Sequence, residues 1–239
     1  MKTIAIIVAG GEGRRMGRRK QFLRIAGKPM LEWTLSAFQK AKIIDGIILV
    51  AAKEQFPLAK KLCFSKIIEV VEAGAERQDS VKNGLKGLPE SVEIVVIHDG
   101  ARPGVKEDMI DRSVRAARKW GAAVVGVPVK DTVKKILNSK SEIRNNVEII
   151  RTIDRDDLWV AQTPQAFRVS IIKKAYAKLR GEVTDDAMAV EKLGLPVKMI
   201  MGSYANLKVT TLEDMRIMEG ILTHPPTPSL RKRGGESER

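Results

Sequence analysis

The fold is decided by the segment Ile4-Ala5-Ile6-Ile7-Val8-Ala9-Gly10-Gly11-Glu12-Gly13-Arg14-Arg15-Met16-Gly17-Arg18-Arg19-Lys20-Gln21. Residues 4–9 are apolar without alternation, which predicts a strand buried on both faces of a sheet. Glycines follow, and five of the seven residues 14–20 are Arg or Lys. Glycine N–H groups can approach phosphates closely and the cations add charge, so the loop is predicted to bind a polyphosphate. A solvated surface turn is the alternative.

Similar apolar runs recur along the chain, at Ile47–Ala51, Ile67–Val71, Ile94–Ile97, Ala122–Val129 and Val197–Met201. Segments with apolar residues at helical spacing alternate with them, at Leu31–Ala41, Ser80–Leu88, Glu107–Trp120, Ser170–Leu179, Asp185–Leu193 and Leu212–Leu222. This alternation predicts an α/β fold, with a mostly parallel twisted sheet and helices on both faces. Ligands bind such sheets beyond the carboxyl ends of the strands, so the loops after the apolar runs are the candidate sites.

Two stretches depart from this rhythm. Residues 130–157 contain two extended pieces, Thr132–Leu137 and Val147–Ile153, around a polar turn, which predicts a protruding β-hairpin arm that grips a second subunit. Residues 223–239 are rich in Pro, Gly and charge, which is typical of a disordered tail. We therefore expect one domain at 1–222, with the arm at about 130–157, and a basic tail at 223–239.

Composition limits the classes of function. The net charge is +14, which favours anionic partners such as phosphorylated metabolites, nucleic acid or an anionic membrane. Only 4% of the residues are aromatic and no nucleic-acid-binding motif is present, so no specific nucleic acid is expected. No apolar run approaches the roughly 20 residues of a membrane span. The single cysteine, Cys63, excludes an internal disulfide and suits the cytoplasm.

A second candidate loop is His98-Asp99-Gly100-Ala101-Arg102-Pro103, directly after the run at Ile94–Ile97. A carboxylate at a strand end can hold Mg2+ or another divalent cation, whose shell is completed by phosphate and water. Asp99 is therefore the predicted metal ligand, with a turn-capping role as the alternative. Arg102 either clamps a phosphate or pairs with a surface acid.

Further candidate loops are Gly74-Ala75-Glu76-Arg77-Gln78-Asp79-Ser80-Val81, Gln162-Thr163-Pro164-Gln165, Thr184-Asp185-Asp186 and Asn206-Leu207-Lys208-Val209-Thr210. Ser80 contacts a nucleotide base or is only a helix N-cap, and Thr184 is more readily an N-cap than a ligand. The later loops combine hydroxyls and cations without a nucleophile–base pair, a pattern that suits the binding of a second phosphorylated molecule.

In this order, these motifs resemble the 2-C-methyl-D-erythritol 4-phosphate cytidylyltransferases of the non-mevalonate isoprenoid pathway, from about residue 3 to residue 220. The resemblance implies a single Rossmann-like nucleotidyltransferase domain and a homodimer linked by the arm. It implies transfer of CMP from CTP to 2-C-methyl-D-erythritol 4-phosphate, with release of pyrophosphate. The family loop usually has Pro before its catalytic lysine, where this chain has Arg19, and a slightly longer spacer. Ala75 stands where the family sometimes has an acidic residue.

The resemblance also implies roles for single residues. Arg15 and Lys20 would be catalytic, contacting the triphosphate. The nucleotide-binding residues would be Ala9, Gly10, Gly11, Gly13, Gly74, Ala75 and Ser80. The substrate-binding residues would be Arg102, Thr132, Arg155, Thr163, Thr184 and Lys208, with Thr132 and Arg155 on the arm and therefore available to the partner's site. Mg2+ would bind Asp99. A cytidylyltransferase for ribitol 5-phosphate or another polyol phosphate is the alternative, since only its acceptor pocket would differ.

Overall fold

The structure is a computed structural model of the 239-residue chain. It describes residues 2–11, 22–137 and 147–224. Residues 225–239 of the predicted tail, residues 138–146 at the turn of the predicted arm and most of the first cationic loop lie outside these residues.

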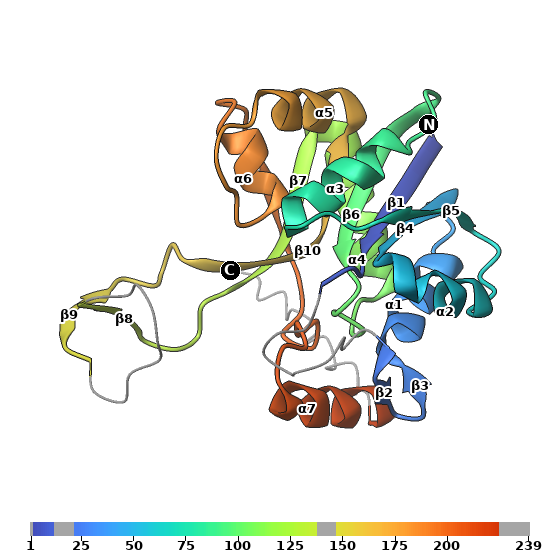
Figure 1. The fold of residues 1–239 in the computed structure, drawn as a ribbon. Helices are drawn as coiled ribbons and strands as arrows, with labels where there is room; N and C mark the ends of the chain where they lie inside the picture. Colours follow the sequence, from blue (N-terminus) through green and yellow to red (C-terminus); the bar gives the residue numbers. More distant parts are fainter. Residues whose placement is uncertain (1, 12–21, 138–146, 225–239) are drawn as a thin grey trace, which may run out of the picture.

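A central sheet of seven strands organises the molecule, in the spatial order β11-β7-β10-β6-β1-β4-β5 (Figure 1). Its strands are β1 (Lys2–Val8), β4 (Gly46–Ala51), β5 (Ile67–Glu72), β6 (Val92–Asp99), β7 (Ala122–Pro128), β10 (Trp159–Arg168) and β11 (Lys198–Met201). All neighbouring pairs are parallel except those of β10, which runs antiparallel to both β6 and β7. The predicted α/β class with a mostly parallel sheet is confirmed.

Strand β10 is not among the strands that the sequence predicts. Its middle is the polar segment Gln162-Thr163-Pro164-Gln165, and proline has no N–H for a strand ladder. The structure accommodates this segment as an irregularity. Trp159–Ala161 pair with β7, the register then shifts, and pairing with β6 begins at Gln165. The unpaired middle of β10 consequently lies beside the carboxyl end of β6.

Helices cover both faces of the sheet, as expected. They are α1 (Met30–Lys40), α2 (Phe56–Lys61), α3 (Arg77–Lys86), α4 (Glu107–Trp120), α5 (Val169–Lys178), α6 (Asp186–Glu191) and α7 (Leu212–Thr223), with a 3-10 turn at Lys53–Gln55. Side chains alternate between the faces of a strand. Accordingly, Ala5 and Ile7 of β1 belong to one core cluster with residues of α1 and α4, whereas Ile4 and Ile6 belong to another with residues of α3, α5 and α6.

Two helix boundaries differ from the predicted ones in ways that matter for the site. Helix α3 begins at Arg77, three residues before the predicted start at Ser80, so Ser80 lies inside the helix and is not its N-cap. Helix α6 has Asp185 as its N-cap, with the carboxylate accepting from the N–H of Met188, so Thr184 is not the cap. Helix α2 is not predicted, because its Phe56–Lys61 is too short to show a clear period.

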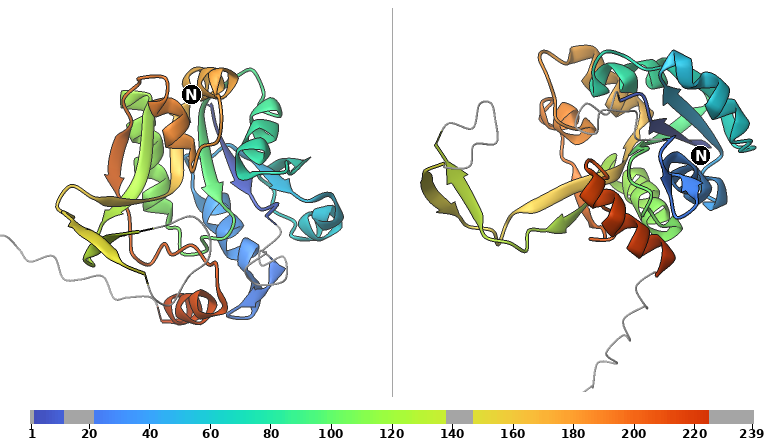
Figure 2. Two further views of the ribbon diagram at one scale, coloured as in Figure 1. Left: turned by 60° about the vertical axis from the view of Figure 1, so that its left-hand side comes forward. Right: turned by 60° about the horizontal axis from the view of Figure 1, so that its bottom comes forward.

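The stretch after β7 forms the antiparallel pair β8 (Val133–Ile136) and β9 (Ile149–Ile153), which extends away from the main sheet (Figures 1 and 2). Its side chains are exposed or half-buried. A second small pair, β2 (Arg24–Ile25) and β3 (Lys28–Pro29), leads into α1.

Helix α7 lies beneath the sheet beside β2 and β3 (Figure 1). A capping box of Thr211 and Asp214 begins it, and Met218 packs in a small core with Ile25 and Val209. The helix ends at Thr223, one residue beyond the predicted domain boundary at 222. No helix in the described part of the chain is both long and apolar enough to cross a membrane.

Candidate functional site

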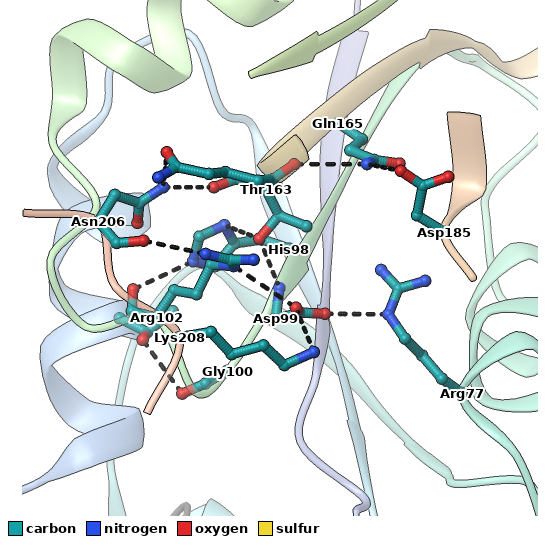
Figure 3. Close-up of polar contacts among 12 residues, drawn as sticks. Arg77, His98, Asp99, Gly100, Arg102, Thr163, Gln165, Asp185, Asn206 and Lys208 are labelled. Carbon is teal, nitrogen blue, oxygen red and sulfur yellow. Dashed lines mark hydrogen bonds and ion pairs between the residues drawn. The ribbon is translucent and has the colours of Figure 1, made fainter. Parts of the chain in front are cut away.

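Asp99, the last residue of β6, is surrounded by three cationic side chains (Figure 3). Its Oδ1 accepts from Nε of Arg77 at 3.0 Å. Its Oδ2 lies 2.9 Å from Nζ of Lys208 and 3.6 Å from Nε of Arg102. These residues come from α3, from the loop after β6 and from the segment before α7. The tertiary structure therefore joins three of the sequence motifs at one carboxylate.

Charge pairing sets the electrostatics of this cluster. Burial raises the pKa of Asp99, but the nearby Arg77, Lys208 and Arg102 lower it more, so the net pKa lies well below its ordinary value. Burial lowers the pKa of Arg102, and Asp99 offsets only part of that effect. Asp99 is consequently a carboxylate at any pH at which the protein works.

Backbone contacts between two loops hold Arg102 and Lys208 in place. Val209 donates its N–H to Ala101 O at 2.9 Å, and Nη1 of Arg102 donates to Asn206 O at 3.0 Å. The buried Asn206 side chain in turn donates to Thr163 O at 2.8 Å. The loop after β6, the middle of β10 and the segment before α7 thus form one hydrogen-bonded unit.

Thr163 and His98 fix the backbone of Asp99 from behind. Nε2 of His98 lies 3.3 Å from Arg102 O, and because a carbonyl only accepts, Nε2 carries the ring proton. Nδ1 then accepts from the hydroxyl of Thr163 at 2.9 Å, while that hydroxyl accepts from the N–H of Asp99 at 3.1 Å. The only hydroxyl proton of Thr163 is therefore committed to His98, and Thr163 can meet a substrate only as an acceptor.

Those predicted nucleotide-binding residues that the structure describes lie on the loops after β1 and β5 or, for Ser80, in the helix that follows the second loop. Ala9 donates its N–H to Val50 O at 2.7 Å, and a Cβ on Gly10 would come within 2.0 Å of the Ala73 side chain, so only glycine fits there. Gly74 donates its N–H to Oγ of Ser80 at 3.0 Å. Gly11 and Ala75 are exposed on the same two loops. Gly13, Arg15 and Lys20 lie outside the described residues.

Three predicted substrate residues do not contact the Asp99 cluster within the described part of the chain. Thr132 is exposed at the start of the β8–β9 stretch, and Arg155 donates to Lys130 O at its base. Thr184 is exposed, and its hydroxyl lies 3.6 Å from the sulfur of Met188.

The predicted metal role of Asp99 stays a prediction. Both of its oxygens face cations, so a divalent ion at Asp99 would require the ion pairs with Arg77, Arg102 and Lys208 to open. Among the described residues, no group of three or more His, Cys, Asp or Glu side chains gathers in a way that could hold a metal. In this arrangement Asp99 is the counter-ion of all three cations.

Several residues with clear roles here carry none in the sequence interpretation. Arg77, Gln165, Asp186 and Asn206 lie within the quoted motifs, but their partners lie 22 to 109 residues away in the chain and are not readable from spacing. Tyr176 gives no sequence signal, because it lies in α5 among apolar residues at helical spacing and resembles an ordinary core side chain.

Comparison with known proteins identifies the family. The family model of 2-C-methyl-D-erythritol 4-phosphate cytidylyltransferase (IspD) matches residues 3–224. The chain belongs to the IspD family. The resemblance that the motifs indicate is confirmed.

Similar members of the IspD family match along nearly their whole length. The enzyme of that name from Alkaliphilus metalliredigens is 44% identical over 231 residues, covering 92% of this chain and 93% of the relative. The crystal structure of 4-diphosphocytidyl-2C-methyl-D-erythritol synthase from Anaerococcus prevotii has a TM-score of 0.81 and 33% identity, covering 93% of this chain and 96% of that one. The IspD structure from Thermus thermophilus has a TM-score of 0.75 at 29% identity, covering 91% of this chain and 98% of that one.

Proposed function

We propose that this IspD-family chain transfers CMP from CTP to 2-C-methyl-D-erythritol 4-phosphate, giving 4-diphosphocytidyl-2-C-methyl-D-erythritol and pyrophosphate. The observation that carries the proposal is the meeting of Arg77, Arg102 and Lys208 at Asp99, beside the glycine-bearing loops after β1 and β5. This reaction must bring two anionic substrates together. The site offers cationic side chains on one side, and on the other side glycine-containing loops whose backbone N–H groups can approach phosphate oxygens closely.

The reaction needs no general base. A phosphate monoester has a second pKa of about 6, so at neutral pH the acceptor phosphate is largely a dianion and is already a nucleophile. One of its oxygens attacks the α-phosphorus of CTP, a new P–O bond forms, and the bond to the bridging oxygen of pyrophosphate breaks. The protein supplies positioning and charge stabilisation, as in other phosphoryl transfers.

The acceptor phosphate is assigned to the Asp99 cluster. Nε of Arg102 is buried and makes no hydrogen bond within the described residues, and the side chain of Lys208 is 39% exposed. In the proposed complex both exchange Asp99 for an oxygen of the phosphate. Thr163 fits as the acceptor of a hydrogen bond from a polyol hydroxyl, because its own proton is committed to His98.

The triphosphate is assigned to the loop after β1. Arg15 and Lys20 stabilise the charge that develops on the α-phosphoryl oxygens, and Ser80 and Gly74 face the base. Mg2+ remains part of the proposal as a companion of the CTP phosphates, and Asp99 would supply one oxygen ligand once its cations turn to the substrate phosphate.

The proposal includes a homodimer joined by the β8–β9 arm. Exposed apolar side chains on the arm and on β10 and β11 support it: Leu137, Val147, Ile149, Ile150, Trp159, Val160, Met199 and Met201. Exposed apolar area of this kind on a small domain favours protein–protein contact. Thr132 and Arg155 would then serve the partner's site. The cytoplasmic location remains a prediction from the single cysteine.

The proposal is tested by incubating the chain with CTP, Mg2+ and 2-C-methyl-D-erythritol 4-phosphate and measuring pyrophosphate release and the mass of the CDP-alcohol. Ribitol 5-phosphate is assayed in parallel. We expect turnover with the methylerythritol acceptor, and a fall of about 100–1000-fold in kcat for Lys20→Ala, the scale for one lost preorganised donor. Faster turnover with ribitol 5-phosphate would show that this polyol phosphate is the acceptor. If neither acceptor gives a CDP-alcohol, the proposed function is rejected.

A further inference from the structure

Arg77 is held between two carboxylates at the edge of the site. Its Nε donates to Oδ1 of Asp99 at 3.0 Å, and its Nη2 donates to Oδ2 of Asp186 at 2.8 Å (Figure 3 shows the Asp99 contact). A guanidinium has five N–H groups in a rigid plane, so two such contacts fix the orientation of the remaining ones. The side chain is 26% exposed, so Arg77 is not sealed inside the core.

Asp186 is fully buried, and its carboxylate and backbone N–H are both hydrogen-bonded to neighbouring elements. Its Oδ1 accepts from the hydroxyl of Tyr176 at 2.5 Å. Its backbone N–H, like that of Ala187, donates to Oε1 of Gln165 at 3.0 Å. Burial and the neighbouring Asp186 raise the pKa of Tyr176, so the phenol keeps its proton and acts as a donor. Tyr176 of α5 thus holds the carboxylate of Asp186, which faces Arg77, and Gln165 of β10 holds the backbone N–H of the same residue.

Stability alone does not account for a buried ion pair of this kind. Desolvating a carboxylate and a guanidinium offsets most of their attraction, and well-packed apolar residues are often as stable or more so. The arrangement does give Arg77 a fixed position and a fixed plane beside Arg102 and Lys208.

We propose that Asp186 and Tyr176 are positioning residues for Arg77, and that Arg77 binds the acceptor phosphate as a third cation beside Arg102 and Lys208. Three cations and two carboxylates, Asp99 and Asp186, leave a net charge of +1 before a phosphate dianion arrives. Because Asp186 holds Arg77 from behind, the guanidinium can exchange Asp99 for a phosphate oxygen without losing its position. This inference rests on the proposed function.

The test is a double-mutant cycle of Arg77→Lys and Tyr176→Phe, read as separate KM values for CTP and for 2-C-methyl-D-erythritol 4-phosphate. A lysine ammonium cannot span Asp99 and Asp186 as a planar fork. We expect Arg77→Lys to raise the acceptor KM about 10- to 100-fold, the factor for one charged hydrogen bond, with the CTP KM within about two-fold of wild type. Tyr176→Phe acts only through Asp186 and is expected to raise the acceptor KM about 3- to 10-fold.

The cycle separates positioning from simple structural support. If Tyr176 acts through Arg77, adding Tyr176→Phe to Arg77→Lys changes the acceptor KM less than about two-fold, because the group that it positions is already gone. Asp45→Asn is the matched control, since Asp45 accepts from the N–H of Thr3 at 2.7 Å at the opposite end of the sheet. It is expected to leave both KM values unchanged. If Arg77→Lys does not fold, Asp186→Asn takes its place in the cycle.

Three results would overturn the inference. The first is an equal effect of Tyr176→Phe on the acceptor KM in wild type and in Arg77→Lys. The second is a lowered melting temperature of the variants with unchanged KM values. The third is a rise in KM that is confined to CTP. Wild-type turnover is measured in the same series. An active wild type with unaffected variants rejects this inference alone, whereas an inactive wild type rejects the proposed function.

Discussion

At the scale of single residues, buried polar groups next to Asp99 fix the position of its backbone. His98 is fully buried, packs against the ring of Phe38, and joins Arg102 O to the hydroxyl of Thr163. Burial is the main reason that the pKa of His98 is lowered to about 3. The ring is therefore neutral in the folded protein, and its tautomer is the one that lets Thr163 accept from Asp99 N–H.

This depressed pKa predicts a pH dependence of stability. An unfolded His98 titrates near pH 6.5, so as the pH falls below that value the unfolded chain binds a proton that the folded protein does not. The stabilisation is complete above about pH 6.5 and is lost as the pH falls toward the folded pKa of about 3. Denaturant unfolding between pH 6 and 4 should show the free energy of unfolding decreasing by up to about 1.4 kcal/mol per pH unit from this group.

The contribution of His98 is isolated by comparing His98→Gln with wild type. The variant should be less stable at pH 7 but have a shallower pH slope, since the buried imidazole is gone. His224→Gln removes the only other imidazole, which is exposed at the end of α7, and is the matched control. Equal slopes for wild type and His98→Gln would show that the ring takes up its proton in the folded state as readily as in the unfolded one.

At the scale of elements, the site depends on how closely the loop after β6 packs on the segment before α7. Gly104 lies at this contact, and a Cβ there would come within 2.1 Å of Ala205 O. Neither backbone can move without moving Arg102 or Lys208, because Ala101 and Val209 are hydrogen-bonded across the same contact. The close approach of two loops thus sets the spacing of two cations.

Gly104→Ala is therefore expected to lower both stability and activity. Overpacking of this kind costs about 1–3 kcal/mol, and the displaced loops should lower kcat/KM for the acceptor. Gly220→Ala is the matched control, because a Cβ on this glycine of α7 meets nothing within 4 Å. Alanine is the better helix former, so this change should stabilise by about 0.5–1 kcal/mol and leave kcat/KM unchanged. Thermal unfolding and steady-state kinetics measure both, and full activity in Gly104→Ala would contradict the role given to the loop contact.

At the scale of the whole molecule, Arg155 and Lys208 are predicted to serve the same reaction from different parts of the fold. Arg155 lies at the base of the β8–β9 arm, which extends away from the sheet (Figure 2). Lys208 lies at Asp99 (Figure 3). In the proposed homodimer, each site takes Lys208 from its own subunit and Arg155 from the partner.

This arrangement predicts subunit complementation. Arg155→Ala and Lys208→Ala should each lose most of the acceptor turnover when assayed alone. Mixed by co-refolding, they form heterodimers in which one of the two sites has both side chains, so about one quarter of wild-type activity should return for random pairing. Size-exclusion chromatography checks that dimers form. Dimers without any recovered activity would show that Arg155 acts in its own subunit or not at all.

The fold was largely predictable because buried parallel strands have continuous apolar runs. The run at Ile4–Ala9 and its equivalents predict β1, β4, β5, β6, β7 and β11. The central strands β1, β4, β6 and β7 are mostly buried on both faces, as such runs indicate, whereas the edge strands β5 and β11 are exposed or half-buried. Strand β10 escapes this pattern because its middle is polar and contains Pro164. Its place between β6 and β7 depends on partners that its own composition does not indicate.

The sequence by itself determined the α/β class, the family and the set of cations available for phosphate, because these follow from local patterns and from motif order. Only the tertiary structure decided that Asp99 pairs with three cations, that Thr163 is an acceptor, and that Tyr176 and Asp186 hold Arg77. Each of these facts depends on contacts between segments far apart in the chain. Such contacts form through packing of the whole sheet and its helices, and no local pattern of residues encodes them.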